Sequence, residues 1–89
     1  AFLNAAMECK AYELICPLMA SIFYRGFRIV AISLLPISHL VYGSCDGGKS
    51  HARLDMKAEM LTARVCSAMN VKNPPGDFEV HLGKYGKLY

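Results

Sequence analysis

Residues 43–50 read Gly-Ser-Cys-Asp-Gly-Gly-Lys-Ser and fit the pattern G-x-x-x-x-G-K-S, which is typical of a phosphate-binding loop. In such a loop, glycines let backbone N–H groups approach phosphate, the lysine meets the outer phosphates and the serine hydroxyl holds Mg²⁺. In this chain the roles would fall to Gly43, Gly48, Lys49 and Ser50. A helix expected to follow would add favourable partial charge. A nucleotide-binding, kinase-like enzyme fragment is therefore one hypothesis for function.

The surroundings of this loop favour another interpretation, a glycine-rich turn between neighbouring strands. The strand expected before it is short and follows a hairpin, whereas the context of a phosphate-binding loop is a strand within a parallel sheet. No later apolar strand ends in an aspartate that could serve a metal, and Asp46 puts a negative charge inside the supposed anion site. We therefore predict a bend in an antiparallel sheet, with no cofactor, no metal and no catalytic residue.

Other residues that could do chemistry are scattered along the chain. The three histidines lie far apart, at His39, His51 and His81. Cys45 and His51 would make a nucleophile and base only if the fold brought them together. Asp77 and Glu79 alternate with apolar residues, which is typical of a half-exposed strand. None of the four cysteines forms a Cys-x-x-Cys pair, so we expect reduced, mostly buried thiols and no zinc site.

The charge balance is mildly basic, with ten Lys and Arg against seven Asp and Glu. This excess allows contact with an anionic partner without requiring one. Five basic residues fall at expected turns or strand ends: Arg25, Arg28, Lys49, Lys84 and Lys87. They are either solvated turn residues or candidates for contact with an RNA backbone.

The chain has 89 residues, enough for one small domain or a piece of a larger one. Its hydrophobic fraction of 54% and mean hydropathy of +0.26 argue against disorder. It starts at Ala1 and stops at Tyr89 inside an expected strand, so we expect a fragment of a larger intracellular protein. The apolar stretch 15–42 is interrupted by arginines, a glycine and prolines, and therefore does not predict a membrane-spanning helix.

The elements that must position these residues follow from periodicity. Residues 2–15 carry apolar residues at helical spacing, and residues 18–24 and 27–34 are rich in β-branched and aromatic residues. The Arg25-Gly26 pair between them predicts a tight hairpin turn. Both faces of the second strand are mostly apolar, which predicts a central strand packed on each side.

The second half of the chain predicts a short strand at 39–42, a helix and a last hairpin. The helix spans residues 52–69, with Ser50 as its expected N-cap and Asn70 in the left-handed conformation after it. Its apolar stripe is Leu54, Ala58, Leu61, Val65 and Ala68. The last hairpin joins residues 77–83 to 87–89.

These elements predict an α+β fold in which antiparallel hairpins pack against one main helix, with a further N-terminal helix. We expect a single partial domain over residues 1–89, made of an N-terminal helical segment at 1–17 and a core at 18–89.

The ordered segments of the chain resemble the central domain of the clustered-mitochondria (CLU) protein family. The segments are YRGFRIVA at 24–31, LPI at 35–37, LVYGS at 40–44, Asp46, GK at 48–49, MNVK at 69–72, EVHLG at 79–83 and GKLY at 86–89. The resemblance implies a large cytoplasmic protein, often with tetratricopeptide repeats, that associates with messenger RNA and translation machinery and influences mitochondrial distribution. It carries no catalytic residue, and it implies a scaffold or RNA-associated binding module whose partners include the rest of the parent protein.

Overall fold

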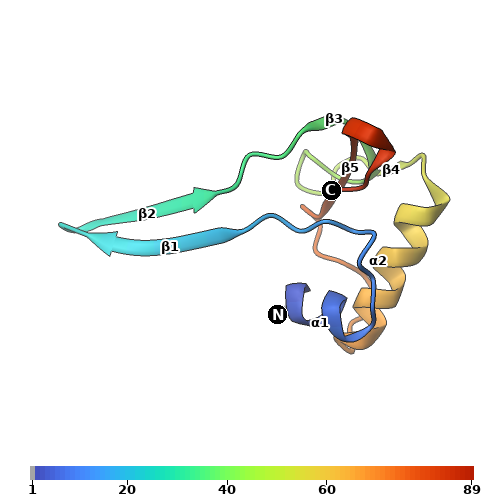
Figure 1. Ribbon diagram of the computed structural model, residues 1–89, viewed down its shortest axis with the longest axis horizontal. Coiled ribbons are helices and arrows are strands. Elements are labelled where there is room, and N and C mark those ends of the chain that lie inside the picture. Colours follow the sequence, from blue (N-terminus) through green and yellow to red (C-terminus); the bar gives the residue numbers. More distant parts are fainter. Residues whose placement is uncertain (1) are drawn as a thin grey trace.

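Two helices and two antiparallel sheets make up residues 2–89, the part of the chain that the computed structural model describes (Figure 1). In chain order the elements are α1 (Phe2–Glu8), β1 (Met19–Tyr24), β2 (Phe27–Ile32), β3 (Ile37–Gly43), β4 (Ala52–Arg53), α2 (Met56–Ala68), β5 (Glu79–Gly83) and a 3₁₀ turn, η1 (Lys84–Gly86). The predicted α+β class is confirmed. None of the helices in this part of the chain is long and apolar enough to cross a membrane.

A three-stranded sheet in the order β4-β3-β5 forms one side of the core. Both pairings are antiparallel, so residues 44–51 connect β3 to its neighbour β4 as the predicted bend. Beyond β5, the chain turns through η1 and returns, and the backbones of His81 and Tyr89 exchange hydrogen bonds of 2.8 and 2.9 Å. This confirms the last hairpin and fixes the C-terminal segment beside the sheet.

Helix α2 packs against both β3 and α1 (Figure 1). It starts later than predicted, because residues 52–53 pair with β3 as β4 and are no longer available to the helix. Its N-cap is Asp55, and the prediction of Ser50 was wrong. Asn70 does take the left-handed conformation, with φ of 59°, and the Val71 N–H donates to Cys66 C=O to close the last turn.

Helix α1 is shorter than the predicted helix over 2–15. Lys10 adopts a left-handed φ of 59°, and the Ala11 N–H donates back to Ala6 C=O at 2.9 Å. The chain then leaves the helix so that the Ile15 N–H donates to Leu88 C=O. The local apolar spacing was outweighed here by pairing with the far end of the chain.

The core lies between the two helices, β3, β5 and the C-terminal segment. Its buried residues are Ala5, Ala6, Ala11, Leu14, Val41, Tyr42, Ala58, Leu61, Val65, Val80 and Leu88. Three of the five stripe positions predicted for α2 are among them, whereas Leu54 and Ala68 are exposed.

Strands β1 and β2 form a separate hairpin that projects away from this core (Figure 1). Their register is continuous from Met19↔Ile32 to Tyr24↔Phe27. Arg25 and Gly26 both have positive φ, 48° and 80°, which confirms the predicted tight turn and matches the twist of the strands. Every residue of both strands is exposed. The prediction that β2 is packed on each side was therefore wrong within residues 2–89, because α1, α2 and β3–β5 bury their apolar faces against one another.

Candidate functional site

The loop after β3 is organised by the carboxylate of Asp46. Its Oδ1 accepts from the Ser44 hydroxyl at 2.6 Å and from the Ser50 N–H at 3.0 Å. Its Oδ2 accepts from the Ser50 hydroxyl at 2.6 Å. The hydrogen bonds from Ser44 and then Ser50 hold the pKa of the Asp46 carboxyl well below its usual range. A fixed negative charge thus stands at the centre of the loop.

Three of the donors that the phosphate hypothesis requires are engaged within the loop. The Gly48 N–H donates to the Ser44 hydroxyl at 2.8 Å, while both donors of Ser50 point to Asp46. Helix α2 begins only at Met56, after β4, so its N-terminus does not adjoin the loop. Lys49 is exposed. This geometry disfavours the phosphate-binding hypothesis for Gly43, Gly48, Lys49 and Ser50.

The glycines of the motif have a packing role instead. Gly43 has a φ of +97°, and a Cβ built there would overlap the backbone carbonyl of Phe78. Gly48 has a φ of +87°, and its Cβ would come within 3.3 Å of Gly76 O. The loop therefore lies close against the segment that leads into β5, and only glycine fits at both positions without strain.

The five basic candidates do not form one patch. Arg25 and Arg28 belong to the projecting hairpin, at one end of the long axis of the molecule (Figure 1). Lys49 lies in the loop after β3, and Lys84 and Lys87 lie in and just after the turn η1, on the globular part of the molecule away from the hairpin (Figure 1). The structure thus divides the predicted residues into a hairpin pair, a C-terminal pair and a single lysine.

The hairpin pair is surrounded by exposed aromatic side chains. The Arg25 guanidinium carbon lies 5.3 Å from the centre of the Tyr24 ring. The side chains of Phe23 and Phe27 are among the most exposed apolar groups, at 82% and 73%. Arg28 Nε donates to the Ser21 hydroxyl at 3.1 Å. We define residues 23–28 as the hairpin tip.

No carboxylate neutralises this tip from its own part of the chain. The sequence holds no Asp or Glu between Glu13 and Asp46. The sequence predicts the two arginines as candidate contacts, but it does not predict the exposed aromatic residues beside them, because the strand that contains Phe27 is expected to be covered on both faces. The signal that could have found the site was the alternation of aromatic and basic residues across a two-residue turn.

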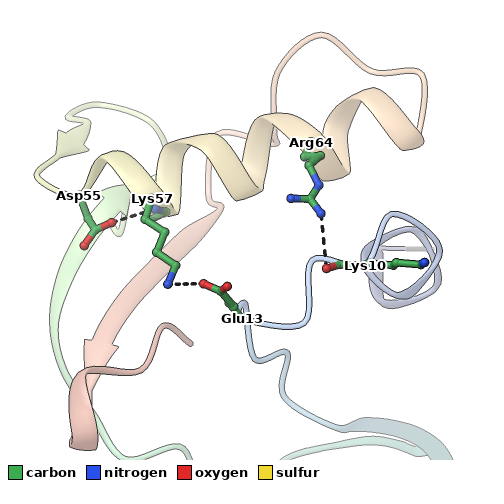
Figure 2. Close-up of polar contacts among 6 residues, drawn as sticks. Lys10, Glu13, Asp55, Lys57 and Arg64 are labelled. Carbon is green, nitrogen blue, oxygen red and sulfur yellow. Dashed lines mark hydrogen bonds and ion pairs between the residues drawn. The ribbon is translucent and has the colours of Figure 1, made fainter.

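A hollow of about 330 Å³ lies beside the N-terminus of α2, and three of its four charged lining residues make contacts within the fold (Figure 2). Lys57 forms an ion pair with Glu13 across it. Asp55 Oδ1 accepts from the Ala58 N–H at 2.8 Å. Further along α2, Arg64 donates to the carbonyl oxygen of Cys9 and so ties α1 to α2.

The remaining titratable candidates stay apart or pair at the surface. His81 Nε2 lies 2.7 Å from Glu79 Oε2 on the same strand, and His39 Nδ1 lies 3.2 Å from the Ser38 hydroxyl. Cys45 is exposed, and among the described residues no hydrogen bond joins it to His51. These positions give no catalytic pair.

Comparison with known proteins gives one family. The family model described as clustered mitochondria (CLU) matches residues 1–89, which is the whole chain. No curated protein and no solved structure gives a significant match.

Proposed function

The chain belongs to the clustered mitochondria (CLU) family, and we propose that it is a non-catalytic module that binds single-stranded messenger RNA within a larger cytoplasmic protein. This role fits a family whose name refers to the distribution of mitochondria. The module would act as a scaffold for RNA and translation machinery, and its contribution to mitochondrial distribution would follow from where it holds the RNA.

The single observation that carries this proposal is the make-up of the hairpin tip. It combines Arg25 and Arg28 with three exposed aromatic rings and no nearby acidic residue of its own strands. Arginine attracts the phosphate backbone, and exposed rings stack on unpaired bases. Because bases are available for stacking mainly in single strands, this chemistry favours loops and unpaired RNA over duplexes.

The geometry of the hairpin suits such contact. Its tip stands away from the core, so a flexible strand can approach it from several sides (Figure 1). Lys84 and Lys87 lie in and just after the exposed turn η1, where they would make a second contact with the backbone of a longer RNA. The two contacts would then lie toward opposite ends of a molecule that extends 44 Å along its longest axis.

The test is a fluorescence-anisotropy titration of a labelled oligouridine at several salt concentrations. We expect the logarithm of affinity to fall linearly with the logarithm of salt concentration, by about 0.7 for each phosphate contact. Replacing both arginines, Arg25→Ala with Arg28→Ala, should flatten this slope. Lys72→Ala, a change of an exposed lysine outside the proposed site, is the matched control.

The proposal fails if binding does not weaken as salt rises, or if the double variant binds as tightly as the original chain. Circular dichroism of the double variant, compared with the original chain, separates a loss of contact from a loss of fold.

A further inference from the structure

The part of the hairpin nearer the core resembles two central strands of a larger sheet, because both of its faces are apolar. We define residues 19–22 and 29–32 as the hairpin stem. One face carries Ile22 and Ile29, and the other carries Met19, Val30 and Ile32. All five are exposed, from 42% to 67%. A pair of strands with two apolar faces is stable in water only when further structure covers it.

The edges of the stem are also unprotected. Natural edge strands carry lysine, proline, an inward charge or a bulge that prevents further pairing. The stem has no Lys and no Pro, and its register continues without a shift. The Ser33 N–H donates to Leu18 C=O, so by alternation Ser21 and Val30 direct their own N–H groups outward. The stem therefore offers hydrogen-bonding groups along both edges.

A shallow, open hollow of about 380 Å³ lies over the stem where it leaves the core. It is lined by Leu18, Met19, Ala20, Ala31, Ile32 and Ser33. The small Ala20 and Ala31 side chains stand opposite each other in the register, and they leave room between the larger residues. A large apolar side chain from another molecule would fill this space.

From these features we infer that the hairpin stem binds an extended, acidic and apolar polypeptide segment. The segment adds as a strand to one edge and places an apolar side chain over Ala20 and Ala31. Its acidic residues face Arg28 and Arg25. Residues 14–45, which include the whole hairpin, hold no carboxylate that could neutralise these arginines. Strand addition satisfies the backbone, and the side-chain pocket gives selectivity.

Two other occupants fit less well. A lipid bilayer would leave the N–H and C=O groups of both edges without partners in hydrocarbon. The hairpin of a second copy would offer Arg25 and Arg28 no carboxylate, because residues 14–45 hold no Asp or Glu. Each strand of the stem is also only about 13 Å long, and a stable dimer buries roughly 1,200 Å² or more. The inference does not depend on RNA binding, because the apolar faces and open edges of the stem carry it. It shares Arg25 and Arg28 with the proposed RNA contact, so the segment and RNA would compete for these two arginines.

The test uses the whole chain and two dye-labelled synthetic peptides. Both alternate valine and threonine, and one ends in glutamates where the other ends in lysines. We expect saturable binding of the glutamate peptide and about tenfold weaker binding of the lysine peptide. Ala31→Phe, which fills the hollow at an exposed strand position, should weaken binding of the glutamate peptide by about tenfold. Ala63→Phe, on the exposed side of α2, should leave it unchanged.

The inference is overturned if the glutamate peptide shows no saturable binding, if both peptides bind equally, or if Ala31→Phe has no effect. It is also overturned if sedimentation shows that the chain alone forms a dimer that Ala31→Phe dissociates, because the occupant is then a second copy. Circular dichroism of both variants checks that each remains folded.

Discussion

The carboxylate of Asp46 holds Ser50 twice, through its backbone N–H at 3.0 Å and its hydroxyl at 2.6 Å. These are two of the groups that the sequence motif assigned to phosphate and metal. The residue that made the motif questionable in the sequence is therefore the one that closes the loop in the structure.

The first prediction concerns the pH dependence of this loop. The pKa of Asp46 is lowered in the folded chain, so its hydrogen bonds stabilise the fold at every pH above the unfolded value of about 4. That contribution is lost only as pH falls through the lower, folded pKa. The NMR signal of the Ser50 amide should therefore stay constant between pH 7 and about 4. A titration of that signal centred near the ordinary aspartate value would contradict the geometry.

The second prediction compares two glycines of the loop. Gly43→Ala should lower the free energy of unfolding by about 3 kcal/mol or more, because a positive φ and overlap with the Phe78 carbonyl add together. Gly47 also has a positive φ, but a Cβ added there would meet nothing within 4 Å. Gly47→Ala should therefore lower the free energy of unfolding by only about 1 kcal/mol. Urea denaturation measures both, and equal losses would show that the close approach is absent.

The third prediction tests the start of α2. Asp55→Ala should reduce the free energy of unfolding by about 1 kcal/mol, because the Ala58 N–H loses its acceptor. Asp55→Asn keeps a side-chain oxygen at the same place and should retain most of the stability. Thermal unfolding followed by circular dichroism distinguishes them, and an Asn variant as unstable as the Ala variant would argue against the cap.

The fourth prediction concerns the contact between the helices (Figure 2). Arg64→Ala removes the hydrogen bonds to the carbonyl oxygens of Cys9 and Lys10 and should lower the free energy of unfolding by about 1 kcal/mol. Lys57→Ala breaks only an exposed ion pair with Glu13, so the free energy of unfolding should fall by less than about 0.5 kcal/mol. Limited proteolysis should cut the first residues faster in the Arg64 variant alone. Equal behaviour of the two variants would mean that α1 is held by its apolar contacts.

The fifth prediction separates stacking from charge in RNA binding. Tyr24→Ser should weaken oligouridine binding by about tenfold, because one base loses its aromatic contact. The salt dependence should stay the same, since no charge is removed. Tyr12→Ser, which changes an exposed tyrosine outside the hairpin, is the control. If the two variants bind alike, the rings of the hairpin tip do not contact RNA.

Features that depend on neighbouring residues could be predicted from the sequence. The Arg25-Gly26 turn sets the hairpin register, and Asn70 ends α2, because each works through its own backbone conformation. The N-cap of α2 could not be predicted in the same way. Pairing of Tyr42 with Arg53 withdraws β4 from the helix, and no local pattern reports that pairing.

The candidate site shows the same division between local and distant effects. The basic residues were found from composition, but their separation into two ends depends on how the hairpin stands relative to the core (Figure 1). The apolar faces of residues 27–34 predict a central strand, yet Phe27 is 73% exposed. Only the packing of the helices with β3–β5 shows that the core closes without them.

The base of the hairpin is closed by two hydrogen bonds, in which the Leu18 N–H donates to the Ser33 hydroxyl and the Ser33 N–H donates to Leu18 C=O, both at 2.9 Å. A segment whose ends are already clamped together can change length at little entropic penalty to the rest of the chain. Evolution could therefore lengthen, shorten or rewrite this arm while the globular part stays as it is.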